Sequence, residues 1–260
     1  MNALKYIIIT SLILLSFKSR AQNVRFVTQG TVEFEKRVNA YALIKQQIKF
    51  WGDDSFSASA FESYQKNNPQ FKVAKSKLVF SNQVTAFLPE EDAIAPSNNW
   101  FSNMVEFKQS NHIQTNLAAG TSKTSKKIYD ETYFVTDSIR KINWKITDEF
   151  RNIAGYNCRR ANALIMDSIY VVAFYAEEIA VSGGPESFSG LPGMILGLAL
   201  PHDHVTWFAT AVTDVPVTED KLKIPTKGKP VDNKQLYDIL KKALKNWGKS
   251  ANQTFKWAML

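Results

Sequence analysis

The stretch that most constrains the fold is a loop rich in glycine and proline, residues 183–193, which runs directly into a short apolar segment. Pro192 followed by Gly193 predicts a type II turn, because proline presets φ at the second turn position and glycine supplies the positive φ of the third. Gly184 before Pro185 predicts a second change of direction, since proline restricts the preceding residue to extended conformations. We therefore expect one preferred shape for this loop.

The segment after the loop, residues 194–200, predicts a strand buried on both faces. It is almost entirely apolar and, lying between two prolines, is too short for a helix. Gly197 in its middle predicts a bulge or a close backbone contact. Phe188 and Leu191 are expected to fix the loop to the core, so that the strand enters the sheet in one register.

A glycine-rich loop can also bind an anion through exposed N–H groups. A phosphate-binding loop, however, needs a Lys-Ser/Thr pair after its last glycine, whereas Gly190 is followed by Leu191. A hydrolase elbow needs a glycine two positions before its serine, and Ser187 does not have one. We interpret the loop as scaffolding. The alternative is a metal-binding protein or hydrolase that uses residues 183–193 with Glu186 or with His202 and His204.

The first 21 residues predict a secretory signal peptide. Lys5 precedes an apolar run over residues 6–17, and Ser19 and Ala21 fit the small residues required before a cleavage site. The run is too short to span a bilayer, and no cysteine follows the cut to carry a lipid anchor. We expect a mature protein of residues 22–260, beginning near Gln22, in the periplasm, at the outer membrane or outside the cell.

The positive charge is confined to one part of the chain. Residues 220–260 carry ten lysines and three aspartates, whereas the mature residues before them have a net charge of about −2. Basic and aromatic residues do not alternate there as they do in proteins that bind single strands, so nucleic acid is an unsuitable partner. With Cys158 as the only cysteine, the exported chain is expected to fold without an internal disulfide.

Strand patterns dominate the rest of the chain, and residues 31–38 alternate apolar and charged side chains as a half-exposed strand does. Residues 56–68 predict a helix, residues 41–50 fit either a strand or a helix, and residues 90–99 and 119–127 predict a loop and a turn region. Because strands follow one another without long helices between them, we predict a mainly β fold with an antiparallel sheet. Further strands are expected at residues 71–74, 78–80, 84–88, 104–107, 113–117, 132–136, 142–146, 153–165, 169–179 and 205–212, the last paired with 194–200.

The last predicted element is an amphipathic helix over residues 233–247 within the basic segment. Asp232, with Gln235 three residues later, predicts its N-cap, and Gly248 predicts its end. The apolar side of the helix is expected to pack against the sheet. The alternative is a basic helix that lies on an anionic membrane surface or on a partner.

The hexapeptide at residues 190–195 resembles the motif that gives its name to the GLPGLI family, exported proteins widespread in Bacteroidetes. Segments upstream resemble the family in the right order: residues 144–146, 153–161, 173–175 and 184–188. Met194, Phe174, Arg160 and Ala180 depart from the family pattern, mostly by side chains of similar size or charge. The resemblance implies a curved, bowl-like antiparallel sheet, an envelope setting and no established activity. The residues that we assign to this structural motif are Gly155, Cys158, Gly184, Pro185, Phe188, Gly190, Leu191, Pro192, Gly193 and Ile195.

Few residues are candidates for catalysis or metal binding. Cys158 is expected to be a small buried side chain rather than a reactive or metal-binding thiol. His202 and His204 would point the same way in an extended loop and could hold copper or zinc if His112, Met166, Met194 or Cys158 joined them, although a solvated turn is the simpler interpretation. Glu177 and Glu178 could act as acid and base with Glu186.

These observations favour a non-enzymatic binding or accessory protein without a cofactor. Strands rich in aromatic residues, an exported address and the lack of catalytic signatures suggest a curved sheet that holds a hydrophobic or extended ligand. A peptide, another envelope protein or an outer-membrane transporter would suit the same surface.

Overall fold

The computed structural model describes residues 26–260 apart from 53–54, 91–100, 102–103, 109 and 249. The predicted signal peptide, residues 1–21, and most of the loop predicted at 90–99 lie outside the described residues. In the part of the chain that is described, no helix is long and apolar enough to cross a membrane.

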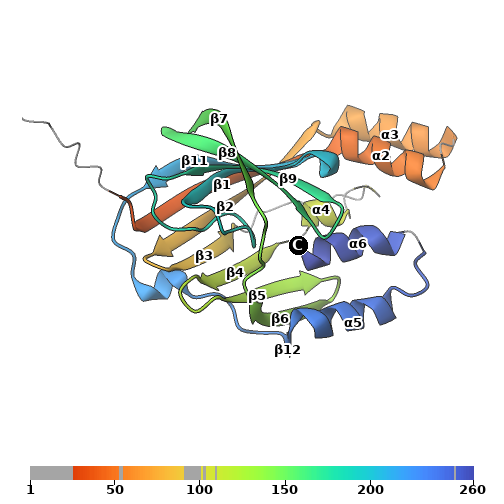
Figure 1. Cartoon of the computed structure of the whole chain (residues 1–260). Helices are drawn as coiled ribbons and strands as arrows, with labels where there is room; N and C mark the ends of the chain where they lie inside the picture. Colours follow the sequence, from red (N-terminus) through yellow and green to blue (C-terminus); the bar gives the residue numbers. More distant parts are fainter. Residues whose placement is uncertain (1–25, 53–54, 91–100, 102–103, 109, 249) are drawn as a thin grey trace, which may run out of the picture.

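Twelve strands form one large sheet (Figure 1). Their order across the sheet is β12-β6-β5-β4-β3-β2-β1-β11-β10-β9-β8-β7, so β12 and β7 are the edges. Neighbouring strands are antiparallel except for β12, which runs parallel to β6. The mainly β antiparallel fold that the sequence predicts is thus confirmed. The strands are β1 Gln29–Asn39, β2 Phe71–Ser81, β3 Val84–Pro89, β4 Asn111–Asn116, β5 Thr121–Ile128, β6 Glu131–Ser138, β7 Lys145–Ile153, β8 Tyr156–Ile165, β9 Ile169–Ala176, β10 Met194–Leu200, β11 Val205–Thr213 and β12 Lys229–Val231.

The sheet curls, with β7, β8 and β9 facing β4, β5 and β6 across its hollow (Figure 1). Register shifts contribute to this curvature, because a β-bulge bends its strand and increases the local twist. One occurs in β11, where Thr210 is the extra residue opposite Glu33 and Phe34 of β1. Another occurs in β10 beside Gly197, where the sequence predicts a bulge or close contact. A further shift lies in the edge strand β7.

Helices cover two parts of the sheet. The paired helices α2 Ala40–Trp51 and α3 Ser55–Asn67 extend beyond the end of β1, whereas α5 Asn233–Ala243 lies beside β6 (Figure 1). The short α4 Val105–Lys108 and the helix α6 Ser250–Met259 lie at one end of the hollow, and the C-terminal end of α6 points into it. Two short 3-10 turns, η2 Pro201–Asp203 and η3 Glu219–Leu222, precede and follow β11.

The main core lies between the inner face of the curled sheet and α6. Along β1, Val32, Phe34, Lys36 and Val38 are buried while the residues between them are more exposed, so the period of two predicted for this strand is present. Trp257 of α6 belongs to the same cluster of buried side chains as Val32 and Phe34. The C-terminal helix is therefore part of the core of the sheet.

The amphipathic helix predicted at residues 233–247 is present but shorter, since α5 ends at Ala243. Its N-terminus has the predicted capping box, in which Asp232 accepts from the Gln235 N–H. Leu236 and Leu240 pack with Ile128, Tyr133 and Val135 of the sheet, as expected. Ile239 and Trp247, two other apolar residues within the predicted helix, are exposed.

Three predictions about helices and strands are wrong. The chain does not end with the helix at 233–247, because α6 follows it. Residues 104–107 are not a strand: α4 begins at Val105 and places Glu106 in a buried position beside α6. Residues 121–128 form β5 rather than a turn region, because β4 and β6 supply backbone partners on both sides of a segment that is polar apart from Ile128.

Candidate functional site

The glycine- and proline-rich loop is packed against the core along most of its length. Phe188 and Leu191 each expose 2 % of their surface and belong to the main buried cluster. The indole N–H of Trp144 donates to the Ser189 carbonyl over 2.9 Å. The Gly190 N–H donates to the Ser182 hydroxyl over 3.0 Å. The loop thus has fixed contacts at both ends.

The predicted type II turn at residues 191–194 does not form. The Gly193 N–H donates to the Leu191 carbonyl over 2.8 Å, which is the hydrogen bond of a γ-turn centred on Pro192. The tighter turn arises because Gly193 lies against the end of β9: a Cβ on this residue would stand 2.2 Å from the Ala176 carbonyl oxygen. Glycine is required here by close approach of two backbones.

The same loop brings a carboxylate into the hollow of the sheet. Glu186 has a φ of +53°, and its side chain accepts a hydrogen bond of 3.0 Å from Asn111 of β4. Lys36 of β1 and Lys126 of β5 lie close enough to act electrostatically on this carboxylate. Burial raises the pKa of Glu186, and the two lysines partly oppose that shift.

Burial also shifts the pKa values of the surrounding charges. It lowers the pKa of Lys36, and it lowers that of Lys126 to about 8 with a smaller contribution from the nearby Arg140. The carboxyl of Glu106 has a raised pKa for the same reason. Pairs of buried groups with displaced pKa values are typical of functional sites, but they also occur where charges hold elements together.

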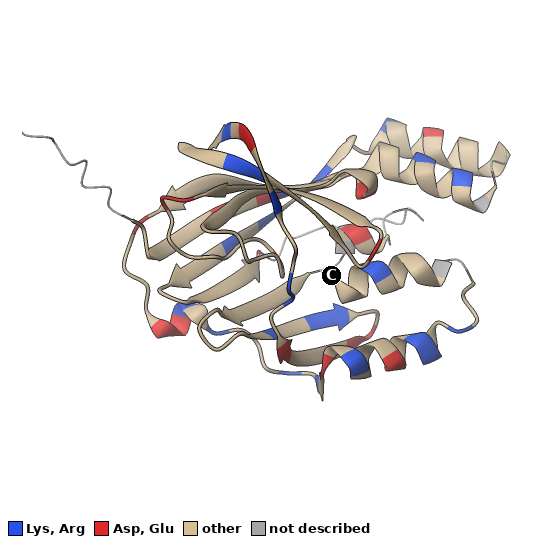
Figure 2. Cartoon of the chain, viewed as in Figure 1, with Lys and Arg blue, Asp and Glu red and all other residues tan. Residues whose placement is uncertain are grey.

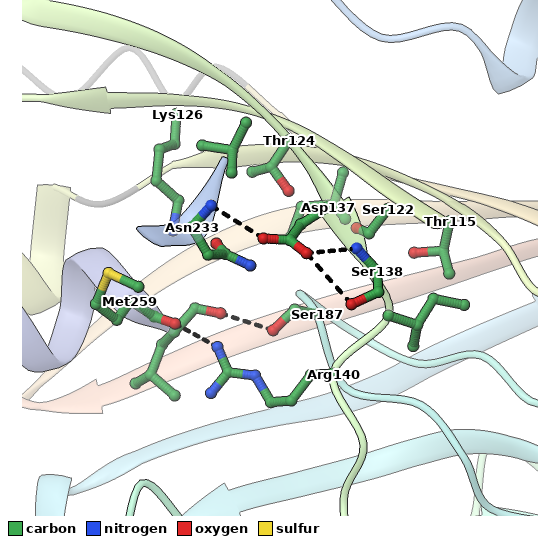
Figure 3. A pocket seen from close by; sticks show the side chains of 14 residues that line it. Thr115, Ser122, Thr124, Lys126, Asp137, Ser138, Arg140, Ser187, Asn233 and Met259 are labelled. Atoms are coloured by element: carbon green, nitrogen blue, oxygen red, sulfur yellow. Dashed lines mark hydrogen bonds between the residues drawn. The ribbon is translucent and has the colours of Figure 1, made fainter. Parts of the chain in front are cut away.

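In this protein the buried charges hold α6. Lys126 donates to the Ala258 carbonyl over 2.6 Å, and Ser187 donates to the main-chain oxygen of Leu260 over 2.6 Å. Arg140 donates to the Met259 carbonyl between them (Figure 3). Cations and hydroxyls at this end complement the partial negative charge of the last carbonyls of a helix.

The other turns of α6 are attached in a similar way. Gln253 donates to the buried Glu106 over 2.5 Å, and Lys256 forms an ion pair with the buried Asp203. Trp257 and Trp207 of β11 flank the Lys36 ammonium, whose nitrogen is 5.4 Å from each ring centre. Helix α6 therefore closes one end of the hollow and contacts β1 and β5 as well as α4 and η2.

A small polar cavity remains between the C-terminal end of α6 and strands β4, β5 and β6. Its volume is about 50 Å³, which is room for one or two water molecules. Thr115, Ser122, Thr124 and Ser187 line it together with Arg140 (Figure 3). This space is too small for any larger ligand.

A second, open groove of about 800 Å³ lies beside α6. Its walls come from four places: α5, α6, the linker after β6 at residues 138–141, and the hairpin between β8 and β9. Its apolar lining consists of Ile139, Met166, Ile169, Tyr237, Phe255 and Met259. Its charged lining consists of Arg140, Lys141, Lys241 and Lys256.

The cluster His202-Asp203-His204 does not adopt the extended conformation that would point both histidines the same way. Residues Pro201–Asp203 form a 3-10 turn, and His204 follows in the left-handed region with a φ of +55°. His202 is exposed near the Tyr170 ring, whereas Asp203 is buried against Lys256. The described residues contain no group of three or more His, Cys, Asp or Glu that could hold a metal ion.

Cys158 is fully buried in β8, and its thiol lies 3.6 Å from the Tyr156 carbonyl. Burial, with a smaller contribution from Glu178, raises the thiol pKa to about 12, so the thiolate that reacts or binds metals is disfavoured. Gly155, with Ala154, forms the two-residue turn between β7 and β8, where both residues have positive φ.

Of the three glutamates proposed as acid and base, Glu177 and Glu186 contact different partners, and Glu178 acts electrostatically on Cys158. Glu177 is exposed and accepts a hydrogen bond of 3.2 Å from the Tyr175 hydroxyl, while Glu186 accepts from Asn111. Lys36, Lys126 and Glu106 were not predicted from the sequence to belong to a buried cluster. The only available signal was a lysine at an inward position of the alternating pattern in β1, which a half-exposed strand also tolerates.

Three comparisons with known proteins bear on this chain. Residues 164–197, which include the loop, match a family described as "Protein of unknown function (Porph_ging)". A search of curated proteins finds no match. Two solved structures of PNGF-II, in the C2 and P21 space groups, are similar in fold, with TM-scores of 0.52 and 0.51 and sequence identities of 12% and 14%.

The similarity to PNGF-II concerns the fold alone. It covers 81% and 82% of this chain but only 32% and 33% of the PNGF-II chains, so this chain spans about a third of their length. The curled sheet is therefore an arrangement that also occurs in a larger protein.

Proposed function

We propose that this protein is a non-enzymatic binding protein of the cell envelope, and that its ligand lies in the open groove beside α6. The observation that carries this proposal is the groove itself, about 800 Å³ in volume and lined by apolar side chains with a few cations. Small-molecule sites have volumes of roughly 300–1,000 Å³ and combine an apolar wall with a few polar groups.

The contacts inside the hollow favour a ligand site beside α6 over a site between α6 and the sheet. Lys126, Arg140 and Ser187 are each occupied by a main-chain oxygen of α6, and Glu106 is occupied by Gln253. The space left between them is about 50 Å³. Charges held in this way stabilise a packed helix and leave no room for a substrate.

The location of the protein in the cell envelope is also part of the proposal. The match to a family of unknown function overlaps the hexapeptide at residues 190–195, which fits the proposed membership of the GLPGLI family. Together with the signal-peptide pattern, this favours export. N-terminal sequencing of the protein purified from its own cells is expected to begin near Gln22, whereas a protein that begins at Met1 would contradict export with cleavage.

Native mass spectrometry of the protein purified from its native envelope tests the binding function. We expect a bound small molecule that is lost when the groove is blocked. Asn252 lines the groove and is exposed, so Asn252→Cys provides a position for attaching a bulky maleimide. The native Cys158 is buried and should not react.

Lys234→Cys, labelled in the same way, is the control, because Lys234 is exposed on α5 and does not line the groove. Loss of the ligand only from the Asn252→Cys conjugate supports the proposed site. A ligand retained equally by both conjugates would place binding elsewhere, and a protein without any bound molecule would contradict the proposal.

A further inference from the structure

We infer that the ligand of this groove is an anionic amphiphile, with one acidic head group on an apolar chain. The inference rests on the proposed function and adds the chemical class of the ligand. It follows from the distribution of charge around the groove, from the arrangement of its apolar side chains and from the elements that form its walls.

The charge of the groove has a single sign. Arg140, Lys141, Lys241 and Lys256 line it, and none of the described residues that line it is Asp or Glu. Asp203 neutralises Lys256, which leaves three cations at the groove. A concave surface lined by charges of one sign concentrates ligands of the opposite sign, so the groove favours an anion over a neutral or cationic molecule.

The apolar part of the lining requires more than a small anion. Ile169 is buried at the base, whereas Met166 and Tyr237 expose 43% and 44% of their surface. Phe255 packs at 5.1 Å from the Tyr237 ring. Burying such side chains contributes roughly 25 cal/mol per Å² of apolar area, and an inorganic ion would leave them in water. An apolar chain covers them.

The inner end of the groove is the place for the acidic head. The two spaces meet at five residues that line both of them: Ser138, Ile139, Arg140, Asn233 and Met259. The carboxylate of Asp137 also lines the cavity, but not the groove, and it accepts hydrogen bonds from the Asn233 and Ser138 N–H groups. Arg140 uses one nitrogen to bind the Met259 carbonyl and has further N–H donors on its guanidinium. An anionic head bound there places the chain along the side chains of α6 and α5.

The walls argue against an extended peptide. A peptide that binds by strand addition needs a free sheet edge with unpaired backbone groups. The groove is formed instead by side chains of two helices, a linker and the turn of a hairpin. A flexible chain that needs no backbone hydrogen bonds suits these walls.

The test is isothermal titration calorimetry of the intact protein with dodecanoate below its micelle concentration. Dodecanol and dodecyltrimethylammonium are measured beside it as the neutral and cationic analogues. We expect dodecanoate to bind with a stoichiometry near one and at least tenfold more tightly than either analogue.

The charge contribution is tested with the double variant Lys141→Gln/Lys241→Gln. Lys141 and Lys241 are both exposed, and two such charge interactions together change affinity by about tenfold at most. The variant should therefore weaken dodecanoate binding by up to about that factor and leave dodecanol binding unchanged. Lys234→Gln/Lys242→Gln is the control, since both lysines are exposed on α5 and neither lines the groove.

The outcomes separate this inference from the proposed function. If dodecanol or the cationic analogue binds as tightly as dodecanoate, or if both double variants behave alike, the groove is a binding site but the inferred class is wrong. If none of the three amphiphiles binds, while native mass spectrometry still shows a molecule in the groove, the inferred class is again wrong. If neither experiment shows binding in the groove, both proposals fall.

Discussion

Single backbone contacts determine how the glycine- and proline-rich loop enters the sheet. Gly193 allows the loop to lie against the end of β9, and Gly184 allows it to lie on Ile195, where a Cβ would stand 2.8 Å from that side chain's own Cβ. The Ile195 N–H then donates to the Gly183 carbonyl over 2.8 Å. The register of β10 thus depends on residues that have no side chain.

Gly193→Ala should lower the free energy of unfolding by about 2–4 kcal/mol, because the added methyl group would overlap a backbone carbonyl that cannot easily move. Gly120→Ala is the control. Gly120 also has a positive φ, +67°, but nothing lies within 4 Å of its added Cβ, so the loss should be about 1 kcal/mol. Urea denaturation followed by circular dichroism measures both, and equal losses would show that the contact with β9 is unimportant.

Lys126 should give the folded protein a characteristic pH dependence. Its pKa is about 8 in the folded protein and near the ordinary 10.5 in the unfolded chain. Between these values the unfolded chain binds more protons, so the free energy of unfolding rises with pH; below pH 8 both states are protonated and the contribution is constant.

Relative to Lys126→Met, which does not titrate at this position, the wild-type protein should gain on the order of 2–3 kcal/mol between pH 7 and pH 11. Denaturation curves of the two proteins across this range provide the measurement. A constant difference between them would mean that Lys126 keeps an ordinary pKa and is accessible to water.

At the scale of elements, α6 is the feature that the sequence analysis missed. Residues 250–259 contain one buried tryptophan and polar side chains such as Gln253 and Lys256. From the sequence these polar residues are indistinguishable from surface residues, because their partners Glu106 and Asp203 are known only from the structure. Asp203 lies 53 residues from Lys256 in the sequence, and Glu106 lies 147 residues from Gln253. Local patterns do not report such pairs.

Other elements were predictable for physical reasons. Strand β10 is apolar on both faces because it is covered on both, and α5 begins at Asp232 because its side chain caps the helix. Strand β5 was not predictable, because its sequence is polar apart from Ile128 and has no strand pattern. Its backbone partners in β4 and β6 decide its structure, and they also bury Ser125 and Lys126. The groove also required the structure, since four separate segments form it.

Packing of α6 inside the sheet predicts different roles for two C-terminal tryptophans. Trp257 exposes 3% of its surface and Trp247 exposes 49%. Trp257→Ala should lower the free energy of unfolding by about 3–5 kcal/mol, as removal of a large core side chain does, whereas Trp247→Ala should change it by less than about 1 kcal/mol. Urea denaturation compares them. Similar small losses would show that α6 does not pack in the hollow.

At the scale of the whole molecule, one sheet has two different surfaces. Its hollow is closed at one end by α6, and the acidic and basic groups inside it hold that helix in place. Helix α5 carries charges of both signs along its length, whereas the charged residues that line the groove are all Lys or Arg (Figure 2). Similarity to part of PNGF-II shows that such a curled sheet is not restricted to one protein size.

The central claim is that the groove beside α6 is the binding surface, and hydrogen exchange of the intact protein with and without dodecanoate tests it most directly. We predict slower exchange in three segments that are far apart in the sequence: residues 138–141, 166–169 and 252–259, which line the groove. Strands β2 and β3, which do not line it, should be unchanged. Protection confined to other segments, or no protection at saturating dodecanoate, would contradict the claim.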